Sequence, residues 1–494
     1  MRIRTVKTAA QSIAVQVVTY QGKRVVIHKH IGSAKTITDL KLLRDVARQW
    51  IVTVSGQQQL FPESTEDTLL YKHYTYRGFR YGLLQETIQH IFTTLQLNTI
   101  GGKTGSMLLD LALIRTVEPA SKRESQRLLS TLFGIAYDLT TIYRILPACA
   151  SLKEVIEKQL ITFTQKHWGF DFSFVLYDIT TLYFETFTED DLRKTGFSKD
   201  NKIGQPQILV GLIVSPEGFP LSFAVFEGNT FEGNTLIPVI LDFKKKHRIK
   251  TLTVVADAAM ISRKNIAALQ EARLNYIVGA RVGNMSQQTI SRIDHLPRID
   301  GAHLRLSTED GFLIVSFSAK RYAKDKHEME KQLDKAQAIL AGKQESKRNK
   351  FLTKNKHAAY QLNTTVIAKM KRLLGVKGYH TNLMVSDKLI IERYADLWHI
   401  EKSFRISKHD LTVRPVYHFR KQTIIAHLLI CMVSLAVLKY LEITTGKSAR
   451  YVMEQLKSIT DARVFNRITN KEVILRQEIT TEMQELLQKI HRPH

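Results

Sequence analysis

Residues 172–178, FSFVLYD, form a short apolar run that ends in an acidic residue, and this stretch sets the fold of the middle of the chain. Short apolar runs bounded by turn residues are typical of buried strands. Two similar runs follow, PQILVGLIV (206–214) and FPLSFAVF (219–226), and the turn sequence Ser215-Pro216-Glu217-Gly218 joins them. We therefore predict three adjacent strands.

Helices and strands alternate after these three strands. Residues 236–246 suit a helix, TLTVVAD (251–257) is another apolar strand that ends in an acid, 262–273 suit a second helix, and YIVGA (276–280) suits a strand. Three strands followed by helix, strand, helix and strand predict a mixed α/β sheet.

Asp178 and Asp257 each come directly after an apolar strand. This pattern predicts that both carboxylates lie at the same edge of the sheet, where ligand sites of α/β sheets are found. Two carboxylates there repel one another unless a cation lies between them, and oxygen-only ligands favour Mg²⁺ or Mn²⁺ over zinc. The alternative is that each aspartate only caps the turn or helix that follows it.

A third feature is YADLWHIEKSFRISK (394–408), in a long helix predicted from about residue 388 to 407. Tyr394, Glu401 and Lys408 are spaced by seven residues, so a continuous helix would place them on one face. Arg405 follows Glu401 by one turn. A plain Glu401–Arg405 ion pair, worth a few tenths of a kcal/mol, is the alternative, but it does not account for Tyr394 and Lys408.

This helix resembles that of the DDE transposases of bacterial insertion sequences, the cut-and-paste group with an RNase H-like core. Their signature around the catalytic glutamate is Y-(2)-R-(3)-E-(6)-K, and Tyr394, Glu401 and Lys408 match it, whereas Leu397 stands at the arginine position. The resemblance extends to YDITTLYFE around Asp178, VVADAAMIS around Asp257 and HDLTVRPVYH (409–418).

The resemblance implies that Asp178, Asp257 and Glu401 are catalytic and hold two Mg²⁺ or Mn²⁺ ions, with Asp178 bridging them. In such a site, phosphodiester hydrolysis is followed by transesterification. The residues that it implies in DNA binding are Tyr394, which would position the backbone, Arg405 and Lys408, which would hold phosphates, and Trp398, which would stack on a displaced base unless it lies in the core.

Composition limits the class of protein. The 494 residues include 72 Lys and Arg against 46 Asp and Glu, a net charge of +26, which favours a polyanionic partner. Two cysteines exclude a disulfide framework. The apolar stretch 428–438 is too short to span a bilayer, so we expect a buried core helix and no membrane association. The resemblance implies a cytoplasmic protein associated with a bacterial nucleoid.

The expected organisation is an RNase H-like α/β core with an insertion, flanked by helical regions. Residues 121–133 and 138–146 resemble a helix-turn-helix, although an ordinary helical hairpin is the alternative. Residues 56–80 suit a linker. The predicted parts are 1–60 (β-hairpin and helix), 80–167 (helical, DNA-binding), 168–280 (core, first part), 281–378 (insertion with a hairpin at 304–317, a helix at 325–341 and a basic stretch from 343), 379–445 (core, second part, with a strand near 381–385) and 446–494 (helical).

The function expected from the resemblance is that of a transposase that binds the terminal inverted repeats of an insertion sequence and cleaves and joins DNA. Its partners would be double-stranded DNA, as transposon ends and target, and a second copy of the chain in a synaptic complex. The C-terminal helices at about 450–490 are candidate dimer contacts. Two alternatives are a catalytically inactive DNA-binding relative or repressor, and an RNase H-type nuclease or resolvase.

Overall fold

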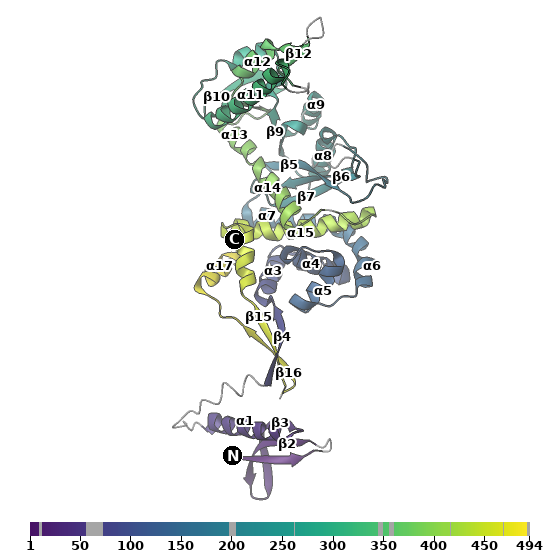
Figure 1. Ribbon diagram of the computed structural model, residues 1–494, viewed down its shortest axis with the longest axis vertical. Coiled ribbons are helices and arrows are strands. Elements are labelled where there is room, and N and C mark those ends of the chain that lie inside the picture. Colours follow the sequence, from purple (N-terminus) through teal and green to yellow (C-terminus); the bar gives the residue numbers. More distant parts are fainter. Residues whose placement is uncertain are drawn as a thin grey trace. The chain divides into compact units, whose positions relative to one another are not determined.

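The computed structural model describes residues 1–8, 12–55, 73–196, 204–260, 262–343, 349–354, 360–414, 416–467 and 469–491 (Figure 1). The chain forms two compact units. The first consists of Met1–Glu86, Ser130–Gly134 and Glu454–Gln484, and the second of Thr87–Leu129, Ile135–Met453 and Glu485–His494.

A small antiparallel sheet and one helix begin the first unit. The β-hairpin predicted within residues 1–60 is confirmed, and Gly22 in its turn adopts the positive φ of 63° that a tight turn requires. A further strand, not predicted, pairs with the hairpin. The elements are β1 (Arg2–Lys7), β2 (Ile13–Gln21), β3 (Arg24–Ala34) and α1 (Ile37–Ser55), whose apolar face packs on the sheet.

A second sheet of the first unit corrects two predictions. β15 (Asp461–Asn466) pairs with β16 (Lys471–Arg476) and with β4 (Tyr74–Arg80). The prediction that 446–494 is only helical is therefore wrong for the hairpin, although α16 (Ala449–Ser458) and α17 (Thr481–His491) are helices. The linker prediction is wrong for β4, while residues 56–72 lie outside the described residues. The strand partners come from opposite ends of the chain, so no local pattern reveals them.

An eight-stranded mixed sheet is the centre of the second unit. Its order is β10-β11-β14-β9-β8-β5-β6-β7, with β5, β8 and β9 parallel and the other pairs antiparallel. β6 and β8 are buried along their whole length, which explains their continuous apolar sequences. The predicted mixed α/β fold is confirmed. The strands are β5 (Val175–Tyr183), β6 (Gln207–Val214), β7 (Pro220–Glu227), β8 (Thr253–Ala256), β9 (Asn275–Ala280), β10 (His303–Thr308), β11 (Gly311–Phe317) and β14 (Val376–Thr381).

The predicted insertion continues this sheet. The predicted hairpin at 304–317 is confirmed as β10 and β11, and β14 joins it to β9. β14 lies earlier in the chain than the strand predicted near 381–385. The basic stretch falls partly outside the described residues, at 344–348 and 355–359, and its contact with nucleic acid stays a prediction. A two-stranded ladder, β12 (Leu352–Lys354) and β13 (Tyr360–Leu362), also lies in this segment.

Helix α15 (Lys421–Thr445) is the core of the second unit. It contacts α4 and α6 as well as strand β7 (Figure 1). Among the described helices it alone is long and apolar enough to cross a membrane, but 94% of its apolar window is buried in the chain, as predicted for a core helix. The other helices from residue 82 onward are α3 (Gly82–Thr94), α4 (Gly102–Val117), α5 (Lys122–Leu128), α6 (Leu139–Cys149), α7 (Lys153–Trp168), α8 (Leu236–Lys246), α9 (Arg263–Glu271), α10 (Gln287–Ile293), α11 (Ala319–Leu340), α12 (Thr364–Arg372), α13 (Asp387–Ala395) and α14 (Leu397–Arg405).

Candidate active site

Asp178 lies inside a strand and not at its end. β5 continues to Tyr183, and Asp178 pairs with Leu212 of β6. The parallel ladder with β8, however, ends at the pair Tyr177–Ala256. Asp178 is therefore the first residue of β5 beyond the end of its ladder with β8.

Asp257 occupies the equivalent position on the neighbouring strand. It directly follows Ala256, the last residue of β8, so Asp178 and Asp257 come next in register on adjacent parallel strands. Neighbouring strands are about 4.8 Å apart, which brings the two residues side by side. The predicted meeting of these carboxylates at one edge is thus supported, although the prediction that β5 ends at Asp178 was wrong. The continuation of β5 depends on pairing with β6.

The predicted single helix over residues 388–407 is two helices, α13 and α14. At the junction, the backbone N–H of His399 donates to the carbonyl of Asp396, three residues back, at 2.8 Å, which tightens the turn. A π-helical turn, Ile406–Asp410, follows α14. Tyr394 is buried at 6% exposure whereas Glu401 is exposed, so the prediction that they share one face of one helix was wrong.

Tyr394 contacts Asp257 directly. Its hydroxyl donates a hydrogen bond to Asp257 Oδ1 at 3.1 Å. Burial, followed by the nearby charge of Asp257, raises the pKa of Tyr394, so the phenol stays protonated and keeps donating. Gly279 of β9 leaves room for this contact, because a Cβ there would collide with the Tyr394 hydroxyl. The buried ring, which also packs edge-on against Tyr379 at 4.9 Å between centroids, leaves little surface for DNA.

Lys377 of β14 lies close to Tyr394, Asp257 and Glu401, and no sequence motif predicted it. Its Nζ lies 4.5 Å from the centroid of the Tyr394 ring. Burial lowers the pKa of Lys377, and Arg321 lowers it further, while Asp257 and Glu401 both act in the opposite direction. Both carboxylates are therefore close enough to Lys377 to affect its charge. A lysine in an alternating strand is ordinary, so only the fold reveals this position.

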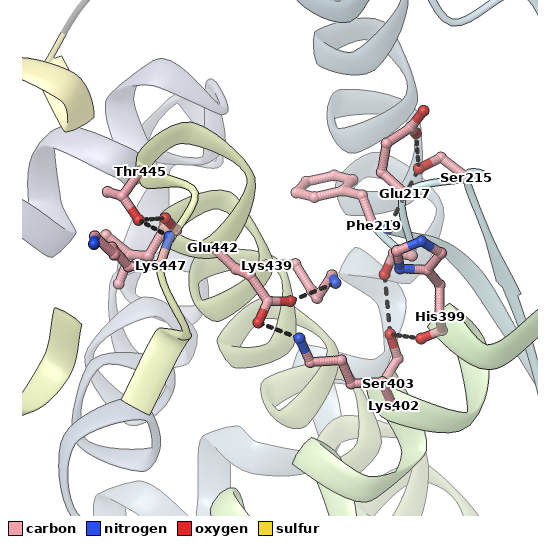
Figure 2. Close-up of polar contacts among 12 residues, drawn as sticks. Ser215, Glu217, Phe219, His399, Lys402, Ser403, Lys439, Glu442, Thr445 and Lys447 are labelled. Atoms are coloured by element: carbon pink, nitrogen blue, oxygen red, sulfur yellow. Dashed lines mark hydrogen bonds and ion pairs between the residues drawn. The ribbon is translucent and has the colours of Figure 1, made fainter. Parts of the chain in front are cut away.

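An ionic network holds α14, the helix that carries Glu401, against α15 (Figure 2). Glu442 of α15 accepts hydrogen bonds from Lys402 at 2.6 Å and from Lys439 at 2.7 Å. Ser403 donates to the carbonyl oxygens of Gly218 and His399, both at 3.0 Å. Because Lys402 and Ser403 directly follow Glu401, these contacts fix the orientation of α14.

The remaining predicted residues lie along α14 and the turn after it. Trp398 is 51% exposed, so the core alternative is wrong; its ring lies 3.8 Å from that of His399 between centroids. Arg405 is exposed. Lys408 is half-buried and lines a small cavity together with Leu182 and other residues. Contact of these side chains with DNA stays a prediction.

The donor set suits a divalent cation. Asp178 and Asp257 supply hard carboxylate oxygens from adjacent strands, and Glu401 shares the electrostatic influence on Lys377 with Asp257. Within the described part of the chain, however, no three His, Cys, Asp or Glu side chains are grouped so that they could hold a metal ion by themselves. The position of the two aspartates directly beyond the last pair of the β5–β8 ladder is therefore observed, while the convergence of all three acids stays a prediction.

Comparison with known proteins identifies the family. The model of the transposase DDE domain matches residues 170–436, more than half of the chain, and this range includes the eight-stranded sheet, α13 and α14. Among solved structures, the chain is similar to a piggyBac transposase synaptic complex with hairpin DNA, with 11% identity over 76% of this chain and 78% of that one; the TM-score of 0.38 is too low to identify a fold. No curated protein matches the chain. The chain therefore belongs to the family with a transposase DDE domain, whose members are phosphoryl-transfer enzymes that act on DNA in transposition and use divalent metal ions.

Proposed function

We propose that this chain is the transposase of a bacterial insertion sequence, that it binds the terminal inverted repeats, and that Asp178, Asp257 and Glu401 form its catalytic centre. The observation that supports this most is the register of Asp178 and Asp257 at the end of the β5–β8 ladder, inside the matched domain. The order of β5 to β9 also suits an RNase H-like core, with β10, β11 and β14 added at one edge.

In this proposal the three acids would hold two Mg²⁺ or Mn²⁺ ions, which supply Lewis-acid stabilisation of the phosphate and lower the pKa of a bound water. The protein positions the strands around them. Arg405 and Lys408 hold phosphates beside the scissile bond, and Trp398 offers an exposed ring to a displaced base. Tyr394, by its hydrogen bond, orients Asp257.

The proposed reaction has two steps. First, a water oxygen attacks the phosphorus at the transposon end; the P–O3′ bond breaks, and a 3′-hydroxyl and a 5′-phosphate result. Second, that 3′-hydroxyl oxygen attacks a phosphorus of the target DNA, a new phosphodiester forms, and the target's own 3′-oxygen leaves. Joining requires both ends of the element, so we propose a homodimer in the synaptic complex and a site of action at the bacterial nucleoid.

The function is tested with the purified full chain, Mg²⁺, labelled duplexes that carry the inverted repeats flanking its coding sequence, and a supercoiled target plasmid. We expect nicking at the repeat end and strand-transfer products, and neither with a scrambled duplex. Cleavage without any joined product would favour an RNase H-type nuclease or resolvase. Binding of the repeats without cleavage would favour an inactive relative or repressor. Either result would overturn the proposal.

Tyr394→Phe tests the orienting role. The variant removes only the hydroxyl that bonds to Asp257, and hydrogen bonds to a charged group are worth about 1.5–3 kcal/mol, so we expect cleavage to slow by roughly 10- to 100-fold. Tyr379→Phe is a matched control, because the Tyr379 hydroxyl lies beside Ser316 and not beside an acid. The measurement is the single-turnover nicking rate of both variants. Equal rates for the two would exclude the role.

A further inference from the structure

A cationic pocket lies between the first turn of α5, the 411–418 loop and α15, within the second unit. Its volume is about 280 Å³, and its lining holds no Asp or Glu among the described residues. None of the three proposed catalytic acids belongs to it. The lining side chains that matter here are Arg115, Lys122, Arg414, Tyr417, His418 and His427.

Lys122 is buried in this pocket, with 5% of its surface exposed. Among the described residues, no Asp or Glu lines the pocket or contributes to the shift of the Lys122 pKa. Burial, followed by repulsion from Arg115, lowers the pKa of Lys122 to about 7; the Cys431 and Cys149 thiols oppose this only weakly. An ammonium taken out of water costs several kcal/mol unless an anion pairs with it. An anion bound in the pocket would therefore favour the charged form of Lys122.

Arg115 adds a second buried charge that is held rigidly. Its guanidinium donates to the carbonyl oxygens of Leu411 at 3.1 Å, Thr412 at 3.3 Å and Ala120 at 3.1 Å. These neutral acceptors bind Nη1 and Nη2 of Arg115 but do not neutralise its charge. They also hold the backbone of residues 411–412 beside the first turn of α5. This part of the pocket wall is therefore formed without a bound ligand.

Two histidines complete the inner wall. His427 is 5% exposed, and its Nε2 lies 3.0 Å from the carbonyl oxygen of Val413. Its Nδ1 is buried and has no hydrogen-bond partner among the residues that the structure describes. The His418 ring lies 5.3 Å from it between centroids, and burial, with Lys122 and Arg115 nearby, lowers the pKa of His418 to about 4. Both rings are therefore neutral at pH 7.

The mouth of the pocket suits a nucleic acid strand. Arg414 is half-buried at the lining, and Tyr417 and Phe419, on the same loop, are 66% and 62% exposed. Exposed rings beside cations are typical of surfaces that bind single strands, where bases stack while cations hold the backbone. The positive charge inside the pocket is complementary to a phosphate group. The basic and aromatic side chains at its mouth suit the rest of a nucleic acid strand to which that phosphate belongs.

We propose that this pocket binds a phosphate group of a DNA strand, held by Lys122 and Arg115 inside and by Arg414 at the rim. The choice of DNA over free phosphate rests on the proposed function, whereas the affinity for a phosphate oxyanion does not. The segment HDLTVRPVYH thereby gains a role that the catalytic acids do not explain.

The first experiment measures thermal unfolding of the full chain against inorganic phosphate, with chloride at matched ionic strength as reference. We expect phosphate to stabilise the parent, and Lys122→Met to weaken phosphate binding by about tenfold or more, since a buried charge-assisted contact is lost. We also expect Lys122→Met to unfold at a higher temperature than the parent in chloride, because an unpaired buried charge has been removed. Lys103→Met, at an exposed position with the same charge change, is the control. Equal phosphate responses in parent and Lys122→Met would overturn the site.

The second experiment distinguishes DNA from free phosphate. Fluorescence anisotropy with a single-stranded and a duplex oligonucleotide is measured without Mg²⁺, so that cleavage plays no part. We expect Lys122→Met and Arg414→Gln each to weaken binding to one of these DNAs by about tenfold and to reduce the salt dependence, relative to Lys103→Met. Loss of the phosphate response with unchanged DNA binding would overturn the DNA assignment. A failure of transposition alone would bear on the proposed function and not on this site.

Discussion

Asp178→Asn and Asp257→Asn are each expected to slow DNA strand cleavage by about 10³-fold or more, because several kcal/mol of charge stabilisation depend on their carboxylates. Asp178 of β5 and Asp257, which directly follows β8, are neighbours in register. Because each holds its own place in the proposed site, we expect that one carboxylate does not compensate for the loss of the other. Glu401→Gln is expected to have an effect of the same order. Single-turnover nicking of an end duplex in Mg²⁺ measures all three. Asp171→Asn is a suitable control, because Asp171 is an exposed acid that bonds within its own turn before β5.

The same variants give a readout that does not depend on activity. Adjacent like charges repel one another, so Asp178→Asn and Asp257→Asn should unfold at temperatures no lower than the parent when EDTA is present. Mg²⁺ should raise the unfolding temperature of the parent but not that of either variant, since a ligand stabilises only the folded state that binds it. If all three acid variants cleaved DNA like the parent, or if Mg²⁺ stabilised them equally, the proposed centre would be wrong.

Glu442→Gln is expected to cause the largest loss of stability. The parent carboxylate bonds to Lys402 at 2.6 Å and to Lys439 at 2.7 Å, and Lys439 is only 1% exposed (Figure 2). Removing one partner of a buried pair costs roughly 3–5 kcal/mol, because the remaining charge is left without compensation. Urea unfolding followed by tryptophan fluorescence is a suitable measurement, since Trp168 stacks on Tyr440 of α15 at 6.2 Å between centroids. Because α14 carries Glu401, cleavage should fall as well.

The effect of Glu442→Gln is expected to depend on pH in a defined direction. Burial alone would raise the pKa of Glu442, but the hydrogen bonds from Lys402 and Lys439 outweigh it and hold the pKa below the ordinary 4.5. A carboxylate whose pKa is lower in the folded state contributes stability that is fully present above its unfolded value and is lost as the pH falls through the folded value. The difference between parent and variant should therefore be constant from pH 7 to about pH 5 and shrink below 4.5.

Glu392→Gln provides the comparison for this stability experiment. Glu392 forms an i, i+4 pair with Lys388 at 4.0 Å, and their side chains are 53% and 82% exposed. Exposed pairs of this kind contribute about 0–1 kcal/mol. A loss from Glu442→Gln no greater than that from Glu392→Gln would show that the network does not stabilise the junction of α14 and α15.

The local pattern was sufficient for elements whose burial repeats along a short stretch. The apolar runs of β6 and β8 and the core helix α15 were predicted because each buries most of its own residues, and α8 was predicted because its buried residues recur at helical spacing. Predictions failed where a partner came from far along the chain. β15 depends on β4, and the last part of β5 depends on β6. The break between α13 and α14 has a local cause instead, a turn closed by the hydrogen bond from His399 to Asp396.

The sequence by itself determined the transposase DDE family and the mixed α/β sheet, since these follow from short motifs and apolar periodicity, and it led to the proposal that Asp178, Asp257 and Glu401 are the catalytic acids. Only the tertiary structure decided which groups surround them. Tyr394 donates a hydrogen bond to Asp257, and the charges of Asp257 and Glu401 act on Lys377. Lys122 and Arg115 line the same pocket. Sheet pairing and helix packing bring these residues together although most of them are distant in the chain. The strength of an electrostatic contact depends on distance and burial, and neither quantity is encoded in the local sequence around any one of these residues.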